Sequence, residues 1–266
     1  MSSSVIFFVL VMCQPTRLFA QKEVTIAPKI LAQGNSADLP KPAADLTAGS
    51  WKYKETDVVP HGKARGTYLA SFSVTVKDDG GVWTVTSAWK SDLGPVTDVS
   101  TYEKGTLVLR KELFDHFLHK DQPWKPVAIN LDFNGNKVTG IMKYVDRPDK
   151  PVTMDLGGPA FASATPDLMI GCLPLADGYS TTFRHFDIDR LPIKPQASNK
   201  LVRLKVVGME RVTVPAGTFD TYRIELTSAD GGSNKETVWI AKDLRIPVRT
   251  SGVNELYGVI TTELVP

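Results

Sequence analysis

The chain has 266 residues and a formal net charge of +2, with 42% hydrophobic and 23% charged residues. This balance is typical of a globular protein that can bury a sizeable core. It provides no strong positive field, so we expect no nucleic-acid partner. The length allows one large or two small domains.

Residues 5–13 form an apolar run, V-I-F-F-V-L-V-M-C. The run is shorter than the roughly 20 residues of a transmembrane helix, but it is typical of the apolar part of a secretory signal peptide. Leu18-Phe19-Ala20 offers a cleavage site before Gln21. We therefore predict a signal peptide over 1–20, a periplasmic or secreted location and no transmembrane segment after cleavage. A lipoprotein cut before Cys13 is the alternative.

Residues 21–48 show no hydrophobic period and several Pro and Gly residues, so we predict an irregular N-terminal arm. The strand pattern begins at residue 49 and continues to the end. We predict a single antiparallel β domain over 49–266, with a subdivision near 157–165 as the alternative.

Alternating apolar residues joined by turn residues predict three hairpins. The first pairs 68–77 with 83–89 through Asp78-Asp79-Gly80-Gly81. The second pairs 127–133 with 138–145 through Asn134-Gly135-Asn136. The third pairs 219–226 with 236–241. Hairpins between neighbouring segments predict an antiparallel meander.

Two segments depart from the strand pattern. Leu113, Phe117 and Leu118 recur near helical spacing, which predicts a short helix over 111–120. Thr165-Pro166 is typical of a helix start, which predicts a second short helix within 165–177. The chain as a whole is predicted to be mostly β.

Residues 211–250 carry the most informative motifs: V-x-V-P-A-G-x-F over 212–219, Tyr222, Trp239, and D-L-x-x-P-V over 243–248. This stretch resembles the C-terminal half of the bacterial domain of unknown function 3108. The resemblance implies an exported protein whose large curved antiparallel sheet is similar to the half-barrel of periplasmic lipoprotein carriers. It brings no catalytic motif. The expected fold is a half-barrel-like meander with one or two short helices.

A curved sheet has a concave face that one short helix does not cover, and uncovered apolar area points to a ligand or a partner. We therefore expect a non-enzymatic binding protein of the bacterial cell envelope. It would hold a lipid or acyl chain, or meet an envelope protein, without a cofactor. The aromatic residues that would line the groove are Trp83, Trp89, Phe133, Tyr222 and Trp239. The alternative is that they belong to the core.

A second hypothesis is an exported metal-dependent hydrolase. His116 and His119 are three residues apart, so on a helix they could share a metal ion, although a third protein ligand would be needed. Solvated histidines on a polar helix face are the alternative. The chain lacks G-x-S-x-G, G-x-x-x-x-G-K-[ST], G-x-G-x-x-G and H-E-x-x-H motifs. A third hypothesis is a structural or adhesive surface protein.

Two further groups are weaker catalytic candidates. Cys172 is the only cysteine left after cleavage, and we interpret it as a small buried hydrophobe. Asp187 and Asp189, with Asp167, could provide paired carboxylates for acid–base chemistry. Asp187 and Asp189 would share a strand face, but Arg190 follows them and favours a solvated strand end.

Overall fold

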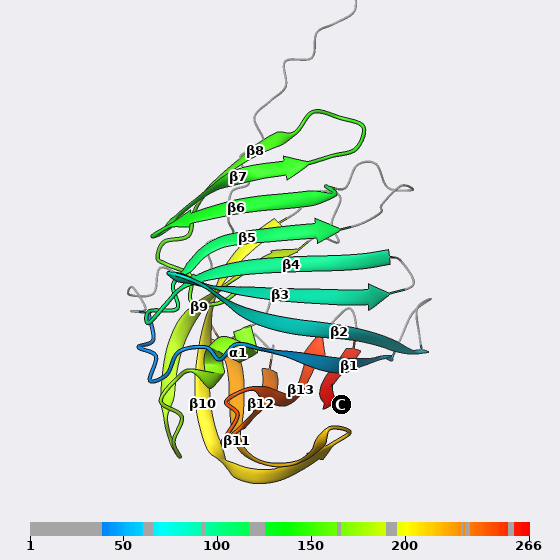
Figure 1. Cartoon of the computed structure of the whole chain (residues 1–266), viewed down its shortest axis with the longest axis vertical. Helices are drawn as coiled ribbons and strands as arrows, with labels where there is room; N and C mark the ends of the chain where they lie inside the picture. The colour runs from blue at the N-terminus through cyan, green and yellow to red at the C-terminus, as the bar shows by residue number, and fades with distance from the viewer. Residues whose placement is uncertain are drawn as a thin grey trace, which may run out of the picture.

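The computed structural model describes residues 39–60, 66–91, 94–116, 126–163, 166–189, 196–229, 231, 235–254 and 258–266. These residues form one sheet of 14 strands and one short helix, α1 (Pro166–Gly171) (Figure 1). The strands are β1 (Gly49–Val59), β2 (Gly66–Asp79), β3 (Val82–Ser91), β4 (Gly94–Glu103), β5 (Leu109–His116), β6 (Ala128–Asn134), β7 (Lys137–Lys143), β8 (Lys150–Asp155), β9 (Ser180–Asp189), β10 (Gln196–Val214), β11 (Gly217–Ser228), β12 (Lys235–Ala241), β13 (Pro247–Asn254) and β14 (Gly258–Val265).

The sheet consists of two meanders joined in its middle. Its order is β8-β7-β6-β5-β4-β3-β2-β1-β14-β13-β12-β11-β10-β9, and every neighbouring pair is antiparallel. The first strand pairs with the last, so β8 and β9, which are consecutive in the chain, lie at opposite edges. Figure 1 shows β8 to β1 stacked in order and β9 to β13 curling behind them. The predicted large curved antiparallel meander is confirmed.

The turn residues explain why the hairpins form where the sequence predicts them. Gly80 and Gly135 have φ values of 75° and 62°, in the left-handed region that glycine adopts without steric cost. They join β2 to β3 and β6 to β7. The V-P-A-G segment is the corner between β10 and β11. Its Ala216 N donates to Leu264 O at 3.1 Å, which ties this corner to β14.

The connection between β8 and β9 runs along the β9 edge. Phe161 N donates to Arg184 O at 3.0 Å, and Phe186 N donates to Ala162 O at 2.9 Å. On the far side of β9, the Phe186 ring meets the Phe133 ring of β6 edge-on, with 5.0 Å between centroids. This ring contact joins β9 of the second meander to β6 of the first.

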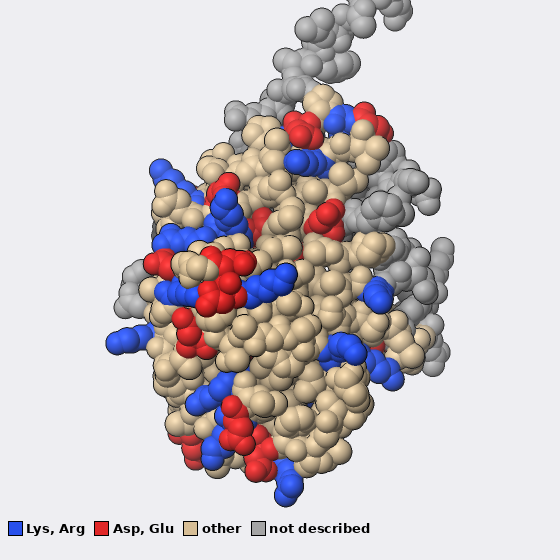
Figure 2. Space-filling model, viewed as in Figure 1, with Lys and Arg blue, Asp and Glu red and all other residues tan. Residues whose placement is uncertain are grey.

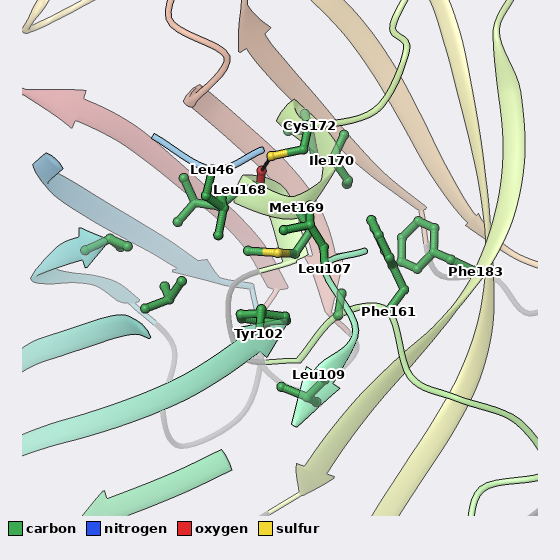
Figure 3. Close-up of a cluster of buried hydrophobic side chains, with 14 of the residues drawn as sticks. Leu46, Tyr102, Leu107, Leu109, Phe161, Leu168, Met169, Ile170, Cys172 and Phe183 are labelled. Atoms are coloured by element: carbon green, nitrogen blue, oxygen red, sulfur yellow. Dashed lines mark hydrogen bonds between the residues drawn. The ribbon is translucent and has the colours of Figure 1, made fainter. Parts of the chain in front are cut away.

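The core lies inside the curl, around α1 (Figure 3). We call the sheet face that carries the buried core side chains the inner face, and the opposite one the outer face. Leu168, Met169, Ile170 and Leu173 are all 3% exposed or less. A Cβ atom at Gly171 would lie 1.9 Å from Arg245 O, so glycine allows α1 to approach the turn between β12 and β13 this closely. The predicted helix within 165–177 is confirmed as this short segment.

The predicted helix over 111–120 is wrong. Residues up to His116 belong to β5, where Leu113 pairs with Val99 on one side and with Asn130 on the other. Pairing on both edges satisfies the backbone of β5, so the sheet overrides the weak helical spacing. Residues 117–120 lie outside the described residues.

The described part of the predicted arm, 39–48, is irregular but closely attached to the sheet. Ala43 N donates to Cys172 O at 2.8 Å. Asp45 Oδ1 accepts from Trp83 Nε1 at 2.5 Å, and Asp45 Oδ2 accepts from Gly105 N at 3.2 Å. Cys172 is buried, and burial raises the pKa of its thiol to about 12, which fits the interpretation of an inert packing residue. The predicted signal peptide, 1–20, lies outside the described residues.

Candidate functional site

Two adjoining cavities lie on the inner face. The first has a volume of about 210 Å³ and the second about 320 Å³. They share three lining residues, Glu236, Thr250 and Ile260. Strands β12, β13 and β14 therefore form a wall common to both cavities, and the two cavities lie side by side on the inner face.

The first cavity has an aromatic wall built by strand pairing. Tyr53 of β1 is the cross-strand partner of Phe72 of β2, and Phe72 is the partner of Trp89 of β3. Directly opposed side chains stand close together on an antiparallel sheet. The rings accordingly stack, with centroids 5.1 Å apart for Tyr53 and Phe72 and 3.9 Å for Phe72 and Trp89. The Tyr53 hydroxyl donates to Pro247 O at 3.0 Å, which links this wall to β13.

The second cavity has an aliphatic and aromatic wall from the other meander. Val202 of β10 pairs with Phe183 of β9, and Leu226 of β11 pairs with Glu236 of β12. His185 and Lys200, which pair with each other, add polar groups to the lining. This space is therefore apolar over much of its wall, with an acidic side chain at one end and basic residues elsewhere in its lining.

Three carboxyl groups line the first cavity from different elements: Glu55 of β1, Asp167 of α1 and Glu236 of β12. Burial raises the pKa of Asp167 well above its usual range, and the charge of Glu236 raises it further. Burial also raises the pKa of Glu236. The pKa of Glu55 is raised to about 7, first by burial and then by the charge of Asp57, although a hydrogen bond from Thr262 opposes the rise. Asp167 Oδ1 is buried and has no hydrogen-bond partner among the described residues.

The basic residues on β12 and β13 direct their charges to the outer face. The Arg249 guanidinium lies 5.3 Å from the centroid of the Trp239 ring, and Arg249 Nε is 3.8 Å from Glu263 Oε1. Lys235 Nζ lies 3.1 Å from Glu225 Oε1. Alternation along β12 places Trp239 on the face opposite to the buried Val238 and Ile240. Arg249 is nevertheless among the residues that line the first cavity, and Lys235 among those that line the second, although their charged groups lie beside Glu263 and Glu225.

The structure places the five aromatic residues predicted to line a groove in three different environments: a cavity lining, the buried core and the outer face. Trp89 lines the first cavity. Trp83, Phe133 and Tyr222 are buried, at 8%, 6% and 8% exposed. Trp239 lies on the outer face, where its Nε1 donates to Glu210 Oε1. Trp89 is thus the member of this set that the structure places in a cavity lining.

The two histidines of the metal hypothesis are only partly described. His116 is the last residue of β5, so the helical spacing on which the shared metal site depended does not hold. His119 lies outside the described residues. In the described ranges, no group of three or more His, Cys, Asp or Glu residues is arranged to hold a metal ion.

The sequence pattern assigned neither Glu55 nor Glu236 to a site, and it indicated Asp167 only together with Asp187 and Asp189. Glu55 alternates with Lys52 and Lys54 on the face of Tyr53, and Glu236 shares a face with Val238 and Ile240. For Glu236, a single acid on an otherwise apolar strand face was the signal that could have identified it. Nothing in the sequence placed the three in one cavity.

The comparisons with known proteins agree with the motifs over 211–250. The model of the family described as Protein of unknown function (DUF3108) matches residues 61–265. The chain belongs to this family. Within this DUF3108 chain, the matched region includes most of the lining of both cavities. No curated protein sequence matches the chain.

Two solved structures are similar to the chain. One is a β-barrel-like protein of the domain of unknown function DUF1849 from Brucella abortus, with 10% identity and a TM-score of 0.44 over 84% of this chain and 98% of that one. The other is the hypothetical lipoprotein YmcC from Escherichia coli, with 9% identity and a TM-score of 0.35 over 81% of this chain and 84% of that one.

The molecular surface shows no dominant sign of charge on the face drawn in Figure 2, where basic and acidic side chains are intermixed. The formal net charge of +2 agrees with this mixture. Among the described residues, no helix has the length and apolar character needed to span a bilayer.

Proposed function

We propose that this protein is an exported, non-enzymatic binding protein of the bacterial cell envelope. It holds a hydrophobic small molecule, such as a lipid or acyl chain, on the inner face of its curved sheet. The observation that carries the proposal is the pair of adjoining cavities with largely apolar walls. Trp89 is the ligand-contacting residue that we retain from the predicted aromatic set.

The size and lining of the cavities support this function. Small-molecule sites usually occupy roughly 300–1,000 Å³ and combine apolar walls with a few polar groups. The second cavity, at about 320 Å³, lies within that range, and the first adds about 210 Å³ beside it. Apolar space inside a protein favours an occupant because burial removes apolar surface from water.

Export is supported by the sequence at the N-terminus. Residues 5–13 are apolar and short, and Ala20 provides a small residue for cleavage. A carrier or sensor of hydrophobic molecules has a role in the envelope, because such molecules cross aqueous compartments poorly on their own.

The test uses a variant whose larger side chain fills the cavity space beside the shared wall. Ile260 lines both cavities, and Val259, its neighbour in β14, is 44% exposed on the outer face. Native mass spectrometry of the full chain would reveal co-purified molecules, and isothermal titration with decanol would measure the affinity for an uncharged chain. We expect Ile260→Trp to weaken decanol binding by about tenfold or more, because the indole occupies the binding space.

Val259→Trp is the matched control, since it adds the same side chain one residue away on the opposite face. It should leave decanol affinity unchanged. Thermal unfolding of both variants checks that each is folded. The proposal is overturned if decanol does not bind to the original protein, or if folded Ile260→Trp binds it as well as Val259→Trp does.

A further inference from the structure

The charge of the cavity lining narrows the chemical class of the ligand. This inference rests on the proposed function. We propose that the ligand is an organic cation with an apolar chain: its ammonium group lies beside Asp167 and Glu236, and its chain extends into the second cavity. The inference concerns head-group chemistry, so it goes beyond the affinity for hydrophobic molecules.

The first step is the excess of acidic groups. Glu55 and Asp57 approach from β1, Asp167 from α1 and Glu236 from β12. Burial raises the pKa values of Glu55, Asp167 and Glu236, and a neighbouring carboxylate raises those of Glu55 and Asp167 further. Arg249 is a basic residue of the same lining, but its guanidinium lies beside Trp239 and Glu263. Burying carboxyl groups without a counter-charge is costly, and such costs concentrate at functional sites.

The second step is the unsatisfied oxygen of Asp167. Its Oδ1 atom is buried, borders the first cavity and has no hydrogen-bond partner among the described residues. An ammonium group would supply either a hydrogen-bond donor or a positive charge at this oxygen. A bound cation would therefore offset the repulsion between the carboxylates, and one with an N–H group would also satisfy this acceptor.

The third step distinguishes an organic cation from a metal ion. In the parts of the chain that the structure describes, no three His, Cys, Asp or Glu side chains are arranged so that they could hold a metal ion. A metal ion also prefers a compact polar shell, whereas this cavity has an aromatic wall of Tyr53, Phe72 and Trp89. Aromatic and acidic side chains together are suited to alkylammonium groups, which have apolar carbon around the charge.

The fourth step places the apolar chain. Glu236 lies in the wall common to both cavities, so a head group beside it has the second cavity directly next to it. Phe183, Val202 and Leu226 form the apolar lining there. The basic residues of the second cavity are His185 of β9, Lys200 of β10 and Lys235 of β12. His185 already has an interacting partner, and Lys235 Nζ lies 3.1 Å from Glu225 Oε1.

Three probes with the same chain test the inference at about pH 8, where the carboxyl groups are most ionised. They are decyltrimethylammonium, decanol and decanoate, titrated into the full chain below their micelle concentrations. We expect the cation to bind at least about tenfold more tightly than decanol, and decanoate to bind most weakly. This order follows from the sign of the charge in the cavity.

Two variants assign the preference to the proposed groups. Asp167→Asn and Glu236→Gln should each reduce the affinity for decyltrimethylammonium by about tenfold while leaving decanol affinity within about twofold. Glu225→Gln is the matched control, because Glu225 lies on the outer face of β11, beside Lys235. It should change neither affinity.

Proton linkage gives an independent readout. The cation should bind more weakly at about pH 5 than at about pH 8, because protonated carboxyl groups are neutral, and its binding near pH 7 should release protons. Equal binding of the three probes, or a preference for decanoate, would overturn the inference while leaving the proposed function intact. If decanol and the cation both fail to bind, the proposed function and the inference fall together.

Discussion

Two regions of the inner face differ in how they are packed. In the packed region, over β4 to β7, Tyr102, Phe114 and Leu131 are 2% exposed or less. In the cavity region, over β1 and β12 to β14 with the adjoining ends of β2 and β3, Phe72 and Trp89 are half-buried and border open space. One continuous sheet therefore has a region packed for stability and a region with room for a ligand.

Both regions contain buried acidic side chains, but in different situations. In the packed region, Asp98 and Glu112 are 4% and 1% exposed, and each has an interacting partner. In the cavity region, Glu55, Asp167 and Glu236 line the first cavity. The acids of the two regions therefore differ in position, because Asp98 and Glu112 are in the lining of neither cavity.

The largest expected effect on the free energy of unfolding comes from truncating one phenylalanine in each of the two regions. Phe114→Ala should lower the free energy of unfolding by about 3–5 kcal/mol, because it leaves a void in a closely packed core. Phe72→Ala should cost only about 1–2 kcal/mol, because its ring is half-buried and already borders a cavity. Denaturant unfolding of both variants provides the measurement. Equal losses would show that the cavity region is as tightly packed in solution as the rest.

A smaller effect concerns Glu55. Its pKa is raised from 4.5 to about 7 in the folded protein, so the folded state holds the proton more strongly than the unfolded state does. Stability therefore falls as pH rises from about 4.5 through about 7. Glu55→Gln removes this loss while keeping an acceptor for Thr262. We expect the variant to be more stable than the original protein by about 1–3 kcal/mol at about pH 8, and nearly equal to it at about pH 4.

Denaturant unfolding across this pH range checks the prediction. Asp132→Asn is the control, because Asp132 is 65% exposed and lies 3.6 Å from Lys111 in a surface ion pair. Its effect should be within about 1 kcal/mol at every pH. A Glu55→Gln variant that loses stability at high pH would indicate that Glu55 is held ionised by a cation instead.

The smallest expected effect concerns the link between the aromatic wall and β13. Tyr53→Phe removes the hydroxyl that donates to Pro247 O at 3.0 Å but keeps the ring that stacks on Phe72. The expected loss is about 0.5–1.5 kcal/mol of the free energy of unfolding. Calorimetry at about pH 7 would detect it. No change would mean that water satisfies the Pro247 carbonyl in the variant, and thus that the cavity is hydrated at this point.

Much of the fold was predictable because local patterns agreed with the tertiary structure. Alternation marked the three hairpins, and glycines placed their turns. The V-P-A-G and D-L-x-x-P-V motifs identified the family because they occupy the β10–β11 corner and the β12–β13 turn. The helix predicted over 111–120 failed because the spacing of Leu113, Phe117 and Leu118 was a weak local signal. Pairing of β5 with β4 and β6 outweighed it.

The candidate site was largely hidden from the sequence. Trp89 could be proposed from alternation, but Trp83, Phe133 and Tyr222 show the same pattern and are buried in the core. Alternation in the sequence distinguishes the two faces of a strand. It does not show whether the space above a face is filled by other side chains or left as a cavity. A cavity depends on how side chains from distant strands fit together, and no local period encodes that fit.

The sequence by itself determined a mostly β antiparallel meander, its family and its turns, because each depends on residues near one another in the chain. The tertiary structure alone decided that β1 pairs with β14 and that α1 lies inside the curl. Those two long-range arrangements bring Glu55, Asp167 and Glu236 into one cavity. The physical reason is that burial and electrostatic coupling depend on distance in space, and the three residues are far apart along the chain.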